Sequence, residues 1–500
     1  MRAAIGASRV AIVRQLLVES IILSLCGGAA GVALAAGLLH AMLKLMPIDV
    51  PRIQSAGLDG RVLLFVLGVS LVTGVLFGSL PAWRVSRLAP VNAMREGSRT
   101  VAGGRGQQRI HNSLVVAQTA IGMVLLICSG LLMRSFIRIL NVNPGFESKH
   151  LLTCRVGLPF GTYDHDKLLV FYRQLLDRIR VLPGVELASA GWPLPMGNNN
   201  ATISFNIEGR PVSRGDEPSE SVGVVLPGYF ETLHVPLIAG RGFGAQDGLS
   251  GPPTMMINQA FAKKYFPGVN PIGQHVQILA GDDVFNSPMR QIVGVIGNIK
   301  RKGLTAEVDP QMYMPYLQAV ITNPYLVVRT HADAAAMQNA VNAAVHSIDK
   351  NVPVYQISTM DDYLSKSAAE PRFQAFLLAC FAGIALVLAA IGLYGLLSYM
   401  VAQRALEIGL RMALGAQRGD VLRMVIRRGL ILALAGVAAG LGISVLVMKL
   451  IAGMLYHTRI TDPVTFAMTT ATLLLVSLAA SSLPAYRAAR LDPMKTLREQ

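Results

Sequence analysis

Residues 114–133, LVVAQTAIGMVLLICSGLLM, are the clearest indication of the fold, because they carry no charge and lie between Arg109 and Arg134. A helix needs about 20 apolar residues to cross a bilayer. A second uncharged run covers residues 373–403. With these two, six stretches of the chain have the required length and apolar character: 17–43, 62–80, 114–133, 373–402, 429–448 and 463–486. The sequence therefore predicts an α-helical integral membrane protein with about six transmembrane helices.

The composition agrees with this prediction. Hydrophobic residues make up 52% of the 500 residues and charged residues only 15%, whereas an ordinary soluble domain has about 25% charged residues. The mean hydropathy is +0.47. These values exclude a disordered or fibrous chain and argue against a soluble enzyme.

Residues 134–372 have a different character, with 21 Lys and Arg balanced by 20 Asp and Glu. Strands are expected at 151–156 and 185–192, and Phe171, Leu175, Ile179 and Leu182 between them fall on one helical face. A second helix, 332–347, is expected between strands 325–329 and 352–357. This pattern predicts an inserted α+β extracytoplasmic domain of two lobes.

The net charge of +16 is unevenly distributed. With six spans, the two chain ends and the loops 84–111 and 403–428 share one side, which holds 19 Lys and Arg against 6 Asp and Glu. Short loops rich in Lys and Arg stay in the cytoplasm, so the large domain is expected outside it. These loops lack interleaved aromatic residues, which disfavours nucleic acid as a partner.

The two ends of the chain resemble each other. RAAIGASR at 2–9 matches RMALGAQR at 411–418, and SLPAWRVSRLAPVNAMRE at 79–96 matches SLPAYRAARLDPMKTLRE at 482–499. Such repeats are typical of duplicated membrane units. Met1 aligns with Leu410, so the first unit lacks counterparts of Glu407 and Gly409. We expect either that these residues are the C-terminal part of a longer duplicated membrane protein or that the chain works as an oligomer.

The segment EIGLRMALGAQRGDVLRMVIRRGLILALAGVAAG, residues 407–440, resembles the cytoplasmic loop and following helix of FtsX-like ABC transporter permeases. YFETLHVPLIAGRGF (229–243) and MINQAFAKKYFPGVNPIGQHV (256–276) resemble parts of the MacB-type periplasmic core domain. The resemblance implies five segments: a partial FtsX-like permease unit with two transmembrane helices (1–100), a cytoplasmic linker (101–113), a transmembrane helix (114–133), a MacB-like periplasmic core domain (134–372) and an FtsX-like permease domain with three transmembrane helices (373–500).

The same resemblance implies a transporter permease subunit rather than an enzyme. A separate cytosolic ABC ATPase would bind ATP, and its cycle would move the outside domain for export, efflux or mechanotransmission. The sequence contains no GxxxxGK[ST] phosphate-binding loop, so no cofactor is expected on this chain. The implied location is the bacterial cytoplasmic (inner) membrane, with the large domain on the periplasmic side. An envelope adaptor and a second permease copy are further implied partners, beside the lipid bilayer.

Two alternatives come from other functional classes. One is a membrane-anchored scaffold or receptor whose extracytoplasmic domain binds partners without coupling to ATP. The other is a membrane-anchored enzyme, which is disfavoured because no nucleophile, base or metal cluster converges in residues 134–372. Co-purification of a cytosolic ATPase separates the permease from both.

Residues 407–418 are expected to couple the ATPase to the membrane helices, through Glu407, Gly409, Arg411, Gly415 and Arg418. The residues alone leave two interpretations: a segment that docks in a partner's groove, or an ordinary juxtamembrane loop anchored by snorkelling arginines. The glycines are expected to let the chain turn tightly. Asp420 is expected to favour a helix start.

Pairs of glycines four residues apart occur at matching repeat positions, Gly27 and Gly31 in one unit and Gly436 and Gly440 in the other. Small residues with this spacing let helices approach closely, so both pairs are expected to be helix-packing faces. No catalytic, cofactor-binding or metal-binding residue is expected. Asp164-His165-Asp166 are adjacent and unsuited to converge on a metal, and residues 300–302, Lys-Arg-Lys, are expected to form a solvated turn.

Overall fold

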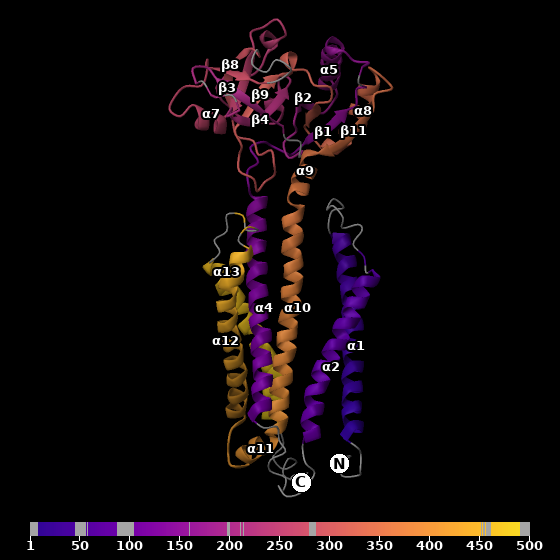
Figure 1. Cartoon of the computed structure of the whole chain (residues 1–500), viewed down its shortest axis with the longest axis vertical. Coiled ribbons are helices and arrows are strands. Elements are labelled where there is room, and N and C mark those ends of the chain that lie inside the picture. Colours follow the sequence, from indigo (N-terminus) through magenta and orange to yellow (C-terminus); the bar gives the residue numbers. More distant parts are fainter. Residues whose placement is uncertain are drawn as a thin grey trace. The chain divides into compact units, whose positions relative to one another are not determined.

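The computed structural model describes residues 9–45, 57, 59–87, 105–159, 161–197, 201–210, 212–213, 215–279, 287–451, 453, 456 and 462–490. The chain divides into two compact units. The helical unit consists of Met1–Ser135 and Pro371–Gln500, and the extramembrane unit of Phe136–Glu370. The division falls inside helix α4 (Arg105–Leu140) and close to the start of α10 (Ala369–Gln403) (Figure 1).

The helical unit also contains α1 (Arg9–Leu45), α2 (Gly60–Arg87), α11 (Ala405–Ala413), α12 (Arg418–Ile451) and α13 (Pro463–Ala489). Among the described residues, five helical stretches are long and apolar enough to cross a membrane: Val13–Ala41, Arg109–Leu140, Ala369–Gln403, Arg418–Leu450 and Pro463–Ala489. The predicted span 62–80 lies in α2, where the apolar stretch found is the shorter Gly60–Leu76. The prediction of an α-helical membrane protein is confirmed, with five rather than six helices reaching full length.

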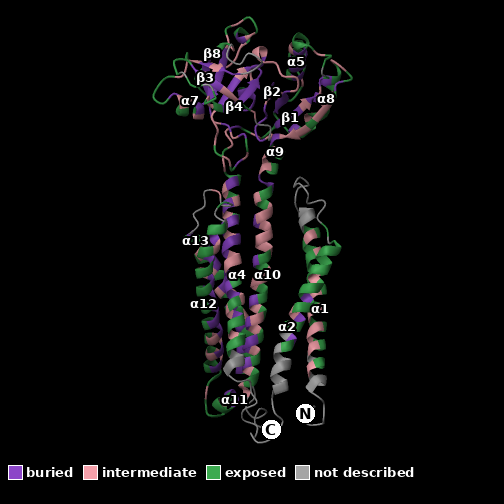
Figure 2. Ribbon diagram, viewed as in Figure 1, coloured by how far each residue is buried: buried purple, intermediate pink, exposed green. Residues whose placement is uncertain are grey.

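Helices α4, α10, α12 and α13 are joined by buried apolar side chains. In one cluster, Ile127 and Leu131 of α4 pack with Val437 of α12 and Leu473 of α13. Another cluster connects α10 and α11 to the same helices. The remaining surfaces of these helices carry exposed leucine, isoleucine and valine (Figure 2), as expected of surfaces that face lipid.

The start of α13 is fixed to α4 by a polar contact. The Asp462 carboxylate accepts a hydrogen bond from the backbone N–H of Thr465 at 3.0 Å, which caps the helix. The same carboxylate forms an ion pair with Arg134 of α4. Asp462 is 8% exposed, so its charge is held by these two partners rather than by water.

The extramembrane unit is built on one 11-stranded, hydrogen-bonded sheet with the order β11-β1-β10-β2-β4-β3-β7-β8-β6-β9, and β5 pairs with β8. A parallel pairing of β4 with β9 closes the strands from β4 to β9 in this order into a ring. The strands are β1 (Leu151–Val156), β2 (Val185–Trp192), β3 (Thr202–Ile207), β4 (Ser219–Val225), β5 (Leu237–Gly240), β6 (Thr254–Asn258), β7 (His275–Ile278), β8 (Met289–Ile296), β9 (Gln311–Pro315), β10 (Tyr325–Thr330) and β11 (Val354–Thr359).

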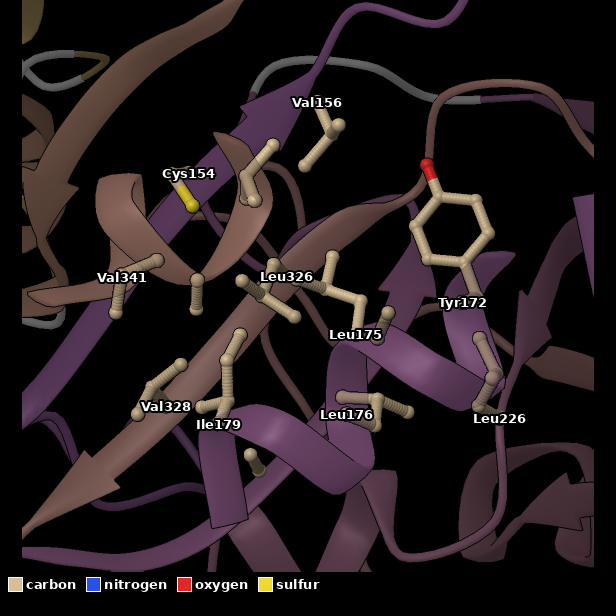
Figure 3. Packing of buried hydrophobic residues seen from close by; sticks show 14 of the residues in the cluster. Cys154, Val156, Tyr172, Leu175, Leu176, Ile179, Leu226, Leu326, Val328 and Val341 are labelled. Atoms are coloured by element: carbon tan, nitrogen blue, oxygen red, sulfur yellow. The ribbon is translucent and has the colours of Figure 1, made fainter. Parts of the chain in front are cut away.

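Two separate hydrophobic cores divide this sheet into two lobes, as predicted. In the first lobe, α5 (His165–Arg180) and α8 (Gln338–His346) pack on the open part of the sheet. Figure 3 shows Leu175 and Ile179 of α5 beside Leu326 and Val328 of β10. In the second lobe, α7 (Gln259–Tyr265) packs against the strands of the ring. The short helices α6 (Tyr229–Thr232) and α9 (Met360–Ser367) complete the unit.

Two polar segments of this unit have defined contacts. Asp164 caps α5 by accepting a hydrogen bond from the Lys167 backbone N–H at 2.9 Å. The predicted solvated turn at 300–302 is wrong for Arg301, which is only 4% exposed and donates to the Val222 carbonyl at 3.2 Å. This contact with β4 is not visible in a local sequence pattern.

Candidate functional site at the α10–α12 connection

The connection between α10 and α12 is a short helix, α11, closed by a glycine turn. Gly415 follows the last helical residues with a φ of +99°, a conformation that favours glycine. Its N–H donates to the Met412 carbonyl at 3.1 Å, and the Ala416 N–H donates to the Arg411 carbonyl at 3.0 Å. These two bonds form a Schellman cap. Gly415 therefore makes the tight turn that was expected of it.

Gly409 does not make a turn, contrary to the expectation for both glycines. It lies inside α11 and is buried. The alternation of apolar and charged residues in this segment conceals its helical period. Ile408 and Met412 are four residues apart, a spacing that places two side chains on the same face of a helix.

The two faces of α11 have different surroundings. Ile408 is 2% exposed and belongs to the core cluster that contains Val421 and Val425 of α12, and Met412 packs against that cluster. Leu410 is 53% exposed and Leu414 is 80% exposed. The helix is thus anchored to the bundle by one face and presents exposed leucines on another.

The charged residues of α11 lie beside the exposed leucines. Arg411 Nη2 and Glu407 Oε1 are 2.7 Å apart, and both side chains are about half exposed. Arg411 Nη1 also lies 3.5 Å from the Met424 sulfur of α12. An exposed pair four residues apart stabilises a helix by only about 0.2–0.5 kcal/mol. Breaking this pair so that its charges bind another molecule therefore costs little free energy.

Arg418 is the first residue of α12, and its side chain is exposed. The helix start is stabilised by Asp420, whose Oδ2 accepts a hydrogen bond from the Gln417 N–H at 3.1 Å. This is the contact expected of an acidic residue in a first helical turn.

The predicted packing glycines of α12 lie against α4. A Cβ added at Gly436 would stand 2.5 Å from Thr119 Cβ, and one added at Gly440 would stand 2.6 Å from Met123 Cβ. Both distances are far below an ordinary contact between carbon atoms, about 3.5–4.0 Å. Only glycine at these two positions permits the observed approach of the helices.

The repeat-related glycines of α1 have no such neighbour. A Cβ added at Gly27 or Gly31 would meet no described atom within 4 Å. Helix α1 instead packs on α2 through Gly28, where an added Cβ would stand 2.3 Å from Ser70 Oγ, and through Gly74 of α2, where it would stand 2.4 Å from Ser24 Oγ. The first helix pair is therefore joined along a different seam.

Comparison with known proteins places these features in a family. The model described as "FtsX-like permease C-terminal" matches residues 1–90 and 379–493, and the model described as "MacB-like periplasmic core domain" matches residues 116–344. The first match falls on both ends of the chain, which is the pattern of the internal repeat.

Two curated relatives illustrate the similarity. The uncharacterized ABC transporter permease YknZ of Bacillus subtilis is 26% identical over 296 residues, which cover 57% of this chain and 71% of that protein. The pyoverdine export ATP-binding/permease protein PvdT of Pseudomonas entomophila is 30% identical over 280 residues, 52% of this chain and 40% of the relative. This chain thus spans less than half of the ATP-binding/permease protein.

Among solved structures, the periplasmic region of MacB from Actinobacillus actinomycetemcomitans matches with 13% identity and a TM-score of 0.31, covering 45% of this chain and 95% of that one.

The family matches on both ends, the inserted domain between them and the long apolar helices agree with one another. The chain is a multi-pass membrane protein of the ABC transporter permease family, with an FtsX-like permease domain and a MacB-like periplasmic core domain.

Proposed function

We propose that this chain is the permease subunit of an ABC transporter of the bacterial inner membrane, in which a cytosolic ATPase on a partner chain docks onto α11. ATP binding and hydrolysis by the partner then move the periplasmic core domain, for export or for mechanotransmission across the envelope. An envelope adaptor and a second permease copy are the further partners that the family resemblance implies.

The observation that carries this proposal is that one face of α11 is buried in the bundle and another is exposed. Ile408 fixes the helix to the bundle core, so a force applied to α11 acts directly on α10 and α12. Leu410 and Leu414 remain exposed at a position that follows the uncharged part of α10. An anchored helix with an exposed apolar and charged face suits a helix-in-groove contact.

The chain connections between the two units support the mechanical part of the proposal. The division between the units falls within α4 and two residues into α10, so both connections are helical. A helix keeps its length under load better than an irregular loop, because its backbone hydrogen bonds are internal. Movements of α4 and α10 are thus suited to reach the periplasmic core domain.

Charge changes on α11 test the docking role. Glu407→Lys and Arg411→Glu each place a like charge opposite a partner that complements the wild type, which costs several kcal/mol. We expect each variant to reach the membrane but to co-purify far less ABC ATPase, identified by mass spectrometry, and to lose ATP hydrolysis by the complex. The exchange Glu407→Arg with Arg411→Glu restores the pair within α11 but presents the opposite charge order. It should fail as the single variants do.

Leucine variants provide a test that is independent of the ion pair. Leu414→Asp should also reduce ATPase co-purification, because an exposed apolar contact is lost at little folding cost. Val181→Asp is a matched control, since Val181 is likewise 80% exposed but lies in the extramembrane unit. Wild-type amounts of bound ATPase in both the exchange variant and Leu414→Asp would exclude docking on α11.

A further inference from the structure

An open groove of about 760 Å³ lies along the first four turns of α12 and beside α4. Its lining residues recur every three to four positions along α12, so they form one stripe of that helix. Arg423, Arg427 and Arg428 occupy the middle of the stripe, and α4 contributes Asn112 to the lining. None of the residues proposed to couple the ATPase lines this groove.

Positive charge dominates the groove. No ion pair or hydrogen bond of Arg423, Arg427 or Arg428 involves a residue within the described ranges. The one carboxylate in the lining, Asp420, already accepts the Gln417 N–H at 3.1 Å. Arg423 and Arg427 are also four residues apart, where like charges destabilise a helix. An anion bound between them would relieve this repulsion.

The far end of the groove is apolar. Ile431 and Leu432 line it one turn beyond Arg428, and no charged residue follows until Lys449. From Asp420 to Leu432 the helix rises about 18 Å, which is more than the thickness of one headgroup layer. The groove therefore reaches from the charged membrane interface into the hydrocarbon region.

We propose that this groove binds an anionic glycerophospholipid from the cytoplasmic leaflet. The arginines bind the phosphate of the headgroup, Asn112 donates or accepts a hydrogen bond at the glycerol or headgroup, and an acyl chain lies along Ile431. Basic pockets between transmembrane helices on the cytoplasmic side are suited to anionic lipids, because that leaflet carries negative charge. A free phosphate would use the arginines but not the apolar end, so the groove selects an amphiphile.

This site has a consequence for the permease. The groove joins α4 to the part of α12 that directly follows α11, and Met424 of the lining contacts Arg411. A bound lipid would stabilise this junction. The inference does not depend on ATPase docking, and its test uses lipid binding alone.

The test uses the purified full chain in a non-ionic detergent, with native mass spectrometry to count bound phosphatidylglycerol, phosphatidylcholine or inorganic phosphate. We expect the wild type to retain phosphatidylglycerol in preference to phosphatidylcholine, and inorganic phosphate at the same concentration not to displace it. Arg423→Gln, Arg427→Gln and Arg428→Gln combined should lower the phosphatidylglycerol affinity roughly a hundredfold, given the contribution of each basic residue near an anionic lipid.

The matched control removes three positive charges that neither line the groove nor belong to residues 407–418: Arg14→Gln, Arg487→Gln and Arg490→Gln combined. This control should keep an affinity close to that of the wild type. Asn112→Trp, which fills the groove without a change in charge, should reduce binding and keeps the test decisive if the triple variant folds poorly. Equal loss in both triple variants, displacement by inorganic phosphate, or wild-type lipid binding by Asn112→Trp would each overturn the proposal. So would a groove variant that loses a co-purified protein while it retains the lipid.

Discussion

Adding one methyl group at Gly436 of α12 should destabilise the protein, whereas the same change at Gly27 of α1 should not. In Gly436→Ala the new Cβ would stand 2.5 Å from Thr119 Cβ, 2.7 Å from Thr119 Cγ2 and 3.1 Å from the Val116 carbonyl oxygen. Because one of these atoms belongs to the backbone of α4, a side-chain rotation alone does not create the required space. Helices α4 and α12 have to move apart locally.

Two opposing contributions set the size of the effect. Alanine is favoured over glycine in a helix by about 1 kcal/mol, whereas overpacking a close contact costs about 1–3 kcal/mol. Gly436→Ala should therefore lower the stability of the helical unit by up to about 2 kcal/mol. Gly27→Ala meets no described atom within 4 Å, so it should be neutral or stabilising by up to about 1 kcal/mol.

Thermal unfolding in detergent micelles, followed by the loss of monodisperse protein, measures this difference. The double variant Gly436→Ala with Thr119→Gly removes the obstructing Cβ and should recover part of the lost stability, which makes the contact visible as a coupling energy. Equal melting temperatures for Gly436→Ala and Gly27→Ala, or strictly additive effects in the double variant, would refute the close-packing explanation.

Further variants test the other structural contacts. Gly415→Ala forces a β-carbon into the left-handed region and should destabilise the end of α11 by about 1 kcal/mol, which a lower melting temperature would reveal. Asp247 is buried, which opposes its ionisation, but hydrogen bonds led by Arg241 lower its pKa. A lowered folded pKa stabilises the fold above the unfolded value of about 4. Asp247→Asn should therefore destabilise the extramembrane unit at pH 7 by about 2 kcal/mol, and the difference from the wild type should fade as the pH falls below about 4. Asp462→Asn should retain the cap of α13 but lose the ion pair with Arg134, whereas Asp462→Ala should lose both. Asp462→Ala should therefore be less stable than Asp462→Asn by about 1 kcal/mol, which a lower melting temperature would reveal.

Periodicity predicted the elements of this chain wherever one face of an element is buried. The expected strands 151–156 and 185–192 coincide with β1 and β2, and the expected face of Phe171, Leu175 and Ile179 is buried in the first lobe. Local spacing is sufficient there because a single buried face imposes the period of the element on the sequence. The pairing of β4 with β9, which closes the ring, joins strands about 90 residues apart and leaves no local signal.

Burial of a charge depends on distant chain segments in the same way. A run of three basic residues is typical of a solvated turn, yet Arg301 is covered and donates to a carbonyl of β4. The connection at α11 was only partly predictable for a related reason. Its charged residues and Gly415 stood out in the sequence, but the anchoring of Ile408 depends on Val421 and Val425 of the next helix.

The two copies of the repeat show which part of helix packing depends on the local sequence and which part depends on the neighbouring helices. Gly27 and Gly31 occupy the same repeat positions as Gly436 and Gly440, but only the second pair is closely approached, by Thr119 and Met123 of α4. In the first pair of helices the seam passes through Gly28 instead, which is rotated by about 100° from Gly27 around the helix. A pair of glycines four residues apart thus marks a face that another helix is able to approach. Which helix approaches it depends on the neighbours, so the Gly27 and Gly31 face remains open within the described residues.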